Sequence, residues 1–205
     1  FNAFFYQHTW KIIKHDVNKA ILYFFSHNKL PIGINATNIA LVPKSPHASS
    51  VTDFRLISCC NVLYKIISKI IANRLQSILP SIISSNQVAF MPHRNISDNI
   101  LLTQELLRGY GTGNISPRCM LKLDIQKAFD SISWSSIIAI LSRMNFPKPM
   151  LAWIYTCIST SHFSILRNGC SKGFFKGTQG VRQGDPISAY LFIIVMEVLN
   201  TLVIE

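Results

Sequence analysis

Apolar residues recur along much of the chain at the three- and four-residue spacing of an amphipathic helix. This spacing predicts a helix that ends near Asn28 and further helices over residues 61–79, 98–108, 134–144 and 149–159. The most apolar stretch, 189–203, contains two polar residues and is shorter than the ~20 residues that span a bilayer. We therefore expect it to form a buried helix.

Short apolar and β-branched runs between these helices predict strands. Residues 39–42 and 54–57 flank a turn-rich, basic segment and predict a hairpin. Asn168-Gly169 separates two more such runs and is a strong hairpin signal. Residues 119–123 predict a strand that ends at Asp124. This alternation of strands and helices indicates a mixed α/β or α+β fold.

The composition excludes a disordered chain and points to an anionic partner. Of 205 residues, 49% are hydrophobic, which is too many for general disorder. The chain has 20 Lys and Arg against 9 Asp and Glu, for a net charge of +11. Such an excess predicts attraction to nucleic acid or to an anionic membrane surface.

The cysteines and the start of the chain bear on its compartment. Five cysteines without a Cys-x-x-Cys pair support neither a disulfide framework nor a zinc site, and they favour a reducing compartment. The chain begins at Phe1 with no basic segment or cleavage site typical of a signal peptide. We expect a fragment of a longer intracellular protein, located in the nucleus or the cytoplasm.

Two polar stretches could carry chemistry. Asp124 and Asp130 lie on either side of a predicted strand-to-helix turn, and carboxylates are the ligands that Mg²⁺ prefers. An aspartate at a strand end can equally serve as a turn residue. Residues 182–186 open an apolar helix, where a helix N-terminus could receive an anion. Alternatively, Asp185 caps that helix and Pro186 occupies its first turn. Neither stretch alone decides between these alternatives.

Taken together, the two stretches resemble a known family. KLDIQKAFDSISW (122–134) and GVRQGDPISAYLF (180–192) resemble palm motifs A and B of reverse transcriptases from non-LTR (LINE-type) retrotransposons, in the form abundant in plant genomes. Residues 35–44 and 53–75 resemble the finger motifs of that family, and 87–106 resemble the segment that follows them. The FRLIS and KAFDSISW forms favour this lineage over bacterial group II intron enzymes.

The resemblance implies an α+β fold, namely part of a right-hand polymerase. It implies a helical segment over 1–30, fingers over 31–118 and the first part of the palm over 119–205. The family's thumb and Asp-Asp palm hairpin do not occur in the sequence. We therefore expect the chain alone to be inactive, with an exposed sheet edge that promotes association. The alternative is a truncated, catalytically dead relic that binds nucleic acid through basic residues.

The resemblance also implies an RNA-directed DNA polymerase that uses two Mg²⁺ ions, an RNA template, a DNA primer and deoxynucleoside triphosphates (dNTPs), without a membrane partner. Asp124 would be the catalytic metal ligand, with the carbonyl of Ile125 on one ion. Asp130 would cap the next helix or pair with a lysine. Arg94 and Arg182 would support contacts to nucleic acid strands or loops. The dNTP would contact Lys44, Arg55, Ile125, Ala128, Phe129, Gln183 and Gly184, with the Phe129 ring excluding a 2′-hydroxyl.

Overall fold

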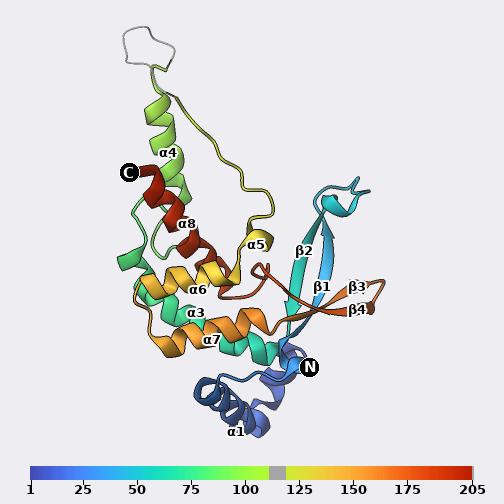
Figure 1. The fold of residues 1–205 in the computed structure, drawn as a ribbon. Helices are drawn as coiled ribbons and strands as arrows, with labels where there is room; N and C mark the ends of the chain where they lie inside the picture. The colour runs from blue at the N-terminus through green and yellow to red at the C-terminus, as the bar shows by residue number, and fades with distance from the viewer. Residues whose placement is uncertain (111–118, 205) are drawn as a thin grey trace.

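The computed structural model describes residues 1–110 and 119–204. They form a four-stranded sheet beside a layer of helices (Figure 1). The strand order is β2-β1-β3-β4. The strands are β1 (Ala36–Pro43), β2 (Phe54–Cys60), β3 (His162–Arg167) and β4 (Cys170–Lys176). The mixed α and β content agrees with an α+β polymerase fragment.

Strands β1 and β2 form the first predicted hairpin. They pair antiparallel from Thr37 opposite Cys60 to Pro43 opposite Phe54. The tip contains a short 3₁₀ helix, η1 (Val51–Asp53). The Asp53 carboxylate accepts hydrogen bonds from the backbone N–H groups of Ser49 (3.1 Å) and Ser50 (2.9 Å). These bonds close the turn in a defined conformation.

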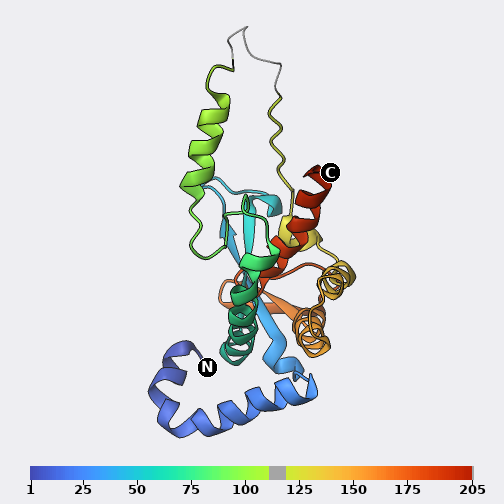
Figure 2. The ribbon, with the colours of Figure 1, turned by 90° about the vertical axis from the view of Figure 1, so that its left-hand side faces the viewer.

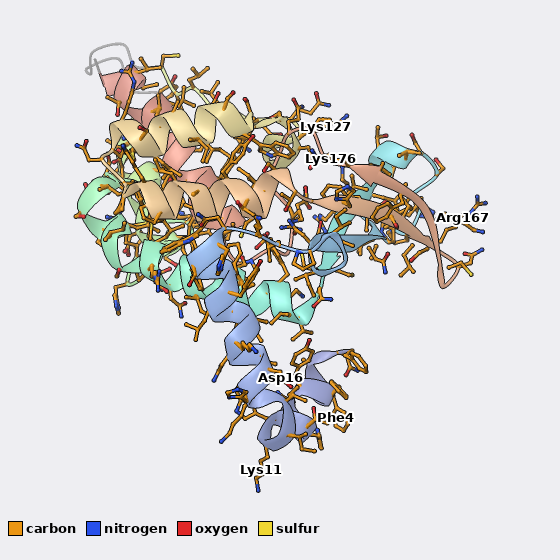
Figure 3. The ribbon with its side chains drawn as sticks, turned by 60° about the horizontal axis from the view of Figure 1, so that its bottom comes forward. Phe4, Lys11, Asp16, Lys127, Arg167 and Lys176 are labelled. Carbon is orange, nitrogen blue, oxygen red and sulfur yellow. The ribbon has the colours of Figure 1, made fainter. Side chains whose placement is uncertain are left out.

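Strands β3 and β4 form the second predicted hairpin. Asn168 and Gly169 at its turn both have positive φ (49° and 77°), as a type I′ turn requires. Figure 3 shows Arg167 on this hairpin, away from the body of helices. Because β3 pairs parallel to β1, with Thr37 opposite Phe163, the sheet contains strands from both sides of residue 118. The domain boundaries stay predictions, but residue 118 does not separate two sheets.

The core lies where α3 (Val62–Ile82) meets α6 (Trp134–Arg143), α7 (Lys148–Ser159) and α8 (Ser188–Ile204). All four helices agree with the apolar spacing to within a few residues. Burying one large aliphatic side chain contributes about 1.5–3 kcal/mol, so the fully buried side chains dominate this packing. They include Ile67, Ile71, Leu75, Ile137, Leu141, Ile154 and Leu191.

Two helix boundaries and the burial of a third helix differ from the sequence expectation. Helix α3 continues past Pro80 to Ile82, because a proline in the last turn removes only one backbone donor. Helix α4 (Ile96–Leu107) is capped by Asn95, whose side chain accepts from Ser97 N at 3.1 Å, while Asp98 lies in its first turn. The expected buried helix over 189–203 is buried only in its first half, since Leu202 is 65% exposed.

Helix α1 (Ala3–His27) ends next to Asn28, as predicted. Asn28 caps the helix in the left-handed conformation. Only Val17 and Phe24 of this helix are buried. Its last turn contacts α7, where Trp153 Nε1 donates to the carbonyl of Phe25 at 3.0 Å. The remainder of α1 extends away from the helical body (Figure 2).

The strand expected over residues 119–123 is absent. These residues have no partner strand within the described part of the chain, and a strand needs one to satisfy its backbone groups. Their apolar side chains lie on the surface, with Met120 50%, Leu121 77% and Leu123 63% exposed. The prediction of a strand was therefore wrong.

Two further sequence expectations concern cysteines and membranes. All five cysteines are free thiols. Among the described helices, none has both the length and the apolar character needed to cross a bilayer.

Candidate functional site

A cavity of about 780 Å³ opens between the β1-β2 hairpin, the turn around α5 (Ala128–Ser131) and the segment before α8. Its volume lies in the usual ~300–1,000 Å³ range of small-molecule sites. We call it the hairpin cleft. Among the site residues expected from the sequence, those that line it are Lys44, Arg55, Ala128, Phe129 and Gln183.

The wall formed by the hairpin is basic. Lys44 and Arg55 extend from the two arms of the hairpin, and both are exposed. The Lys44 backbone N–H donates to the carbonyl of Asp53, and its Nζ donates to the carbonyl of Thr52, both at 2.8 Å. Lys127 also lines the cleft. Such a group of cations suits a phosphate-bearing ligand.

The opposite wall is a turn held by hydrogen bonds between two distant segments. Gly180 N donates to the carbonyl of Ile132, and Val181 N donates to the carbonyl of Phe129, both at 2.7 Å. Gly180 has φ +81°, and an added Cβ would lie 2.8 Å from the carbonyl oxygen of Asp130. Only glycine therefore allows the two segments to approach so closely.

The aromatic ring of Phe129 is held in place by α8. It stacks on Phe192 with a centroid separation of 5.0 Å and an interplanar angle of 10°. The residue is half-buried, and it also lines the hairpin cleft. The packing on Phe192 therefore fixes one side of the cleft wall.

Gln183 and Gly184 lie at the exposed edge of β2. The Gln183 carbonyl accepts a hydrogen bond from Ser58 N at 2.8 Å. Gly184 has φ +103°, and an added Cβ would lie 3.1 Å from the Ser58 carbonyl oxygen. Gln183 lines the hairpin cleft, whereas Gly184 does not.

Asp124 and Ile125 lie outside helices and strands and are exposed. Gln126, which follows them directly, lines the hairpin cleft. Within the described residues, no three His, Cys, Asp or Glu side chains are grouped closely enough to hold a metal ion. The carboxylate of Asp124 is therefore a single potential ligand, and the described residues do not complete a metal site around it.

Arg182, expected to support contacts to a nucleic acid strand or a loop, is buried. It is 7% exposed and forms an ion pair with Asp185, with 3.0 Å between Nη2 and Oδ2. Its guanidinium also lies 4.0 Å from the ring centroid of Tyr64. Burial alone would lower the pKa of Arg182, but Tyr64 and Asp185 outweigh it and hold the pKa above its ordinary value. The ion pair within the turn fits the loop contact considered for Arg182, and a contact between Arg182 and a nucleic acid strand stays a prediction.

Arg94 holds the loop that follows α3. It is half-buried, and its guanidinium donates to the carbonyls of Ile83 (3.2 Å), Ser84 (2.5 Å) and Gln87 (2.5 Å). These bonds fit the loop contact considered for Arg94, and a contact between Arg94 and a nucleic acid strand stays a prediction.

The sequence analysis missed two polar residues near this site. Tyr64 and Ser68 of α3 are fully buried and contact Asp185. A serine within an apolar helical stripe is the signal that could have identified this pair. Asp130 was expected to cap a helix or pair with a lysine, but it lines the hairpin cleft, and Ser133 occupies the cap position of α6.

Comparisons with known proteins agree with the motifs. The family model described as "Reverse transcriptase (RNA-dependent DNA polymerase)" matches residues 42–205. The chain is 28% identical over 193 residues to the transposon TX1 uncharacterized 149 kDa protein of Xenopus laevis, covering 94% of this chain and 15% of the relative. It is 32% identical over 174 residues to the Pol polyprotein of the Drosophila melanogaster type-2 retrotransposable element R2DM. This match covers 84% of this chain and 16% of the relative.

A third relative, the Pol polyprotein of the type-1 retrotransposable element R2 from Nasonia vitripennis, is 27% identical over 193 residues, covering 92% of this chain and 18% of the relative. The chain thus spans less than a fifth of the length of each of these three curated relatives.

Proposed function

Because this chain belongs to the reverse transcriptase family, as a domain homologous to the Pol polyproteins of non-LTR retrotransposons, we propose that it forms the nucleotide-binding part of an RNA-directed DNA polymerase. The hairpin cleft is the observation that carries this proposal. It brings together residues near positions 44–56, 126–131 and 179–183 in one cavity. The RNA template, DNA primer and dNTPs are proposed as the partners of the whole protein.

The charges in the hairpin cleft support a nucleoside triphosphate as the ligand. Lys44 and Arg55 on the hairpin would pair with phosphate oxygens, and such charge-assisted hydrogen bonds are stronger than neutral ones. On the opposite wall, Ala128 and Phe129 would lie beside the sugar, where the fixed Phe129 ring would exclude a 2′-hydroxyl. Gln183 would contact the nucleotide from the third side, and Gly184 would lie beside the template.

The metal requirement of the family is only partly supplied by these residues. Asp124 is proposed as one carboxylate ligand of a two-Mg²⁺ site, with the Ile125 carbonyl beside it. Because the described residues form no metal-binding group, the proposal requires carboxylates from elsewhere in the polyprotein. No metal-dependent step is assigned to the described residues alone.

Primer extension tests this function. The 205-residue chain, given Mg²⁺, an RNA template, a DNA primer and dNTPs, should give no product because it lacks the other metal ligands. A longer polypeptide carrying the Asp-Asp hairpin and thumb should extend the primer, and Asp124→Ala should abolish that activity. Extension by the 205-residue chain, or activity retained in the Asp124→Ala variant, would contradict the metal-ligand proposal.

A second candidate function is a catalytically dead nucleic-acid binder. The net charge of +11 and the lone carboxylate at Asp124 favour it. Such a protein would bind RNA or DNA with an affinity that falls steeply with salt, because phosphate contacts release counterions. Its affinity would not change in Asp124→Ala, and primer extension by the longer polypeptide would exclude it.

A further inference from the structure

The turn between Val181 and Ile187 contains a buried ion pair that joins two layers of the fold. Arg182 and Asp185 lie 3.0 Å apart, and their side chains are 6% and 1% exposed. The Asp185 carboxylate accepts hydrogen bonds from the Tyr64 hydroxyl at 2.5 Å and from Ser68 Oγ. Asp185 is thereby fixed to helix α3.

The other member of the pair is fixed to the sheet and to α7. Arg182 Nη1 donates to Asn35 Oδ1 at 2.7 Å and to Thr37 Oγ1 at 3.2 Å. Its Nη2 donates to the carbonyl of Cys157 at 3.1 Å. The two ends of the turn are therefore attached to different elements, and all of these except α7 lie more than a hundred residues away in the sequence.

Gln183 and Gly184 are the two residues between these fixed ends. Arg182 and Asp185 are buried, whereas Gln183 is half-buried and Gly184 is exposed. The Gln183 carbonyl accepts from Ser58 N at 2.8 Å, and Gln183 itself lines the hairpin cleft. The position of Gln183 in the cleft therefore depends on the anchors on both sides of it.

We propose that the Arg182–Asp185 pair, held by the hydroxyls of Tyr64 and Ser68, is a positioning device that sets Gln183 at the hairpin cleft. The part of this inference that concerns nucleotide affinity rests on the proposed function. Tyr64 and Asp185 are positioning residues, since neither lines the hairpin cleft and Tyr64 acts on the turn through Asp185.

The physical argument concerns specificity more than stability. Desolvation makes a buried ion pair a weak source of net stability, and such pairs are best explained where they select one arrangement. An apolar pair could fill the same space, but it would not fix the register of the Arg182–Asp185 turn against α3. Burial and the nearby Asp185 raise the pKa of Tyr64, so its hydroxyl stays protonated and donates to the carboxylate.

The test uses Tyr64→Phe, which removes one hydroxyl and keeps the ring beneath Arg182. Ser68→Ala removes the second donor and serves as an independent variant. Tyr155→Phe, at a half-exposed position of α7, is the matched control. The readout is hydrogen exchange of the Ser58 amide, which donates to Gln183, with the buried helical amide of Ile71 as the reference for global unfolding.

In Tyr64→Phe and in Ser68→Ala, Ser58 exchange should rise at least about tenfold more than Ile71 exchange, because a bond to a charged acceptor is lost. Tyr155→Phe should change neither. Equal changes at Ser58 and Ile71, or no change at either, would mean that the hydroxyls do not hold the turn, and this would overturn the proposal.

Nucleotide affinity separates this inference from the proposed function. If the chain binds dTTP, the dissociation constant should rise at least about threefold in Tyr64→Phe and stay unchanged in Tyr155→Phe. Faster Ser58 exchange with unchanged dTTP affinity would leave only a structural role for the pair and overturn the proposal. If the unsubstituted chain binds no dTTP, the proposed nucleotide site fails, and the positioning role at that site is overturned with it. The exchange result would then still report whether the pair holds the turn.

Discussion

The turn over residues 182–185 and the segment over 119–125 carry the two motifs of this domain, and they differ sharply in physical character. In the turn, Arg182 and Asp185 are buried and hydrogen-bonded to four other elements. In the segment, Asp124 is exposed and lies outside any helix or strand. The comparison indicates that the described residues organise the proposed nucleotide side of the site, whereas they supply only one carboxylate to the proposed metal side.

The largest expected difference is in the free energy of unfolding after substitution of Asp185 or Asp124. Asp185→Ala leaves Arg182 buried without its partner and should lower the free energy of unfolding by about 3–5 kcal/mol. Asp124→Ala changes an exposed side chain and should stay within about 0.5 kcal/mol. Urea unfolding followed by circular dichroism measures both values. Similar losses of unfolding free energy in the two variants would contradict the difference between a buried, paired turn and an exposed segment.

A smaller loss in the free energy of unfolding is expected at Gly180, where the segment before α8 contacts the turn around α5. Gly180→Ala places a Cβ 2.8 Å from the Asp130 carbonyl oxygen at φ +81°, and strain of this kind costs about 1–3 kcal/mol. Gly33→Ala in helix α2 (Ile32–Asn35) is the control, since an added Cβ meets nothing within 4 Å. The same unfolding assay applies. A harmless Gly180→Ala would show that the close approach is not needed.

Thiol labelling sharpens the comparison without a substitution. Cys119 begins the exposed segment, whereas Cys157 is fully buried and its carbonyl accepts from Arg182. Burial raises the pKa of the Cys157 thiol, so it stays protonated. At pH 8 an iodoacetamide pulse should modify Cys119 at least about a hundredfold faster than Cys157. Equal modification rates at the two cysteines would show that the region around Cys157, to which Arg182 is bonded, opens readily.

The smallest effect is expected at the hairpin tip. Hydrogen bonds from the Ser50 and Ser49 amides lower the pKa of Asp53. The ionised carboxylate therefore stabilises the tip at pH values above its unfolded pKa, and this contribution is lost as the pH falls through the lowered value. The protection of the Ser50 amide, measured as its exchange rate relative to the intrinsic rate at each pH, should fall at acid pH while the buried turn over 182–185 stays protected. In Asp53→Asn, this pH dependence of the Ser50 protection should disappear.

The sequence predicted those elements whose formation depends on residues that are neighbours in the chain. The apolar spacing located α3, and Asn168-Gly169 located the β3-β4 turn, because helix periodicity and turn chemistry depend on neighbouring residues. The strand expected at 119–123 failed because strand formation depends on a partner elsewhere. The burial of Arg182 was not predicted, because charged residues are seldom buried unless paired, and its acceptor Asn35 lies 147 residues away.

In the candidate site, too, the features that depend on contacts between distant residues were not predicted from local patterns. Lys44, Arg55 and Gln183 were named from the resemblance to a family, since no local pattern distinguishes them from other surface residues. Their grouping around one cleft depends on the β1-β2 hairpin folding toward α5. Tyr64 could not be assigned from the sequence, because its role depends on a contact with Asp185 that spans 121 residues.

Photocrosslinking with 5-iodo-dUTP tests the central claim, a dNTP site in the hairpin cleft, most directly. Mass spectrometry should locate crosslinks in peptides that contain residues 44–56, 126–131 or 179–183, which line the cleft. Excess dTTP should suppress these crosslinks, and Lys44→Ala combined with Arg55→Ala should weaken them. Crosslinks at other peptides, or crosslinks at these peptides that excess dTTP does not suppress, would contradict the account.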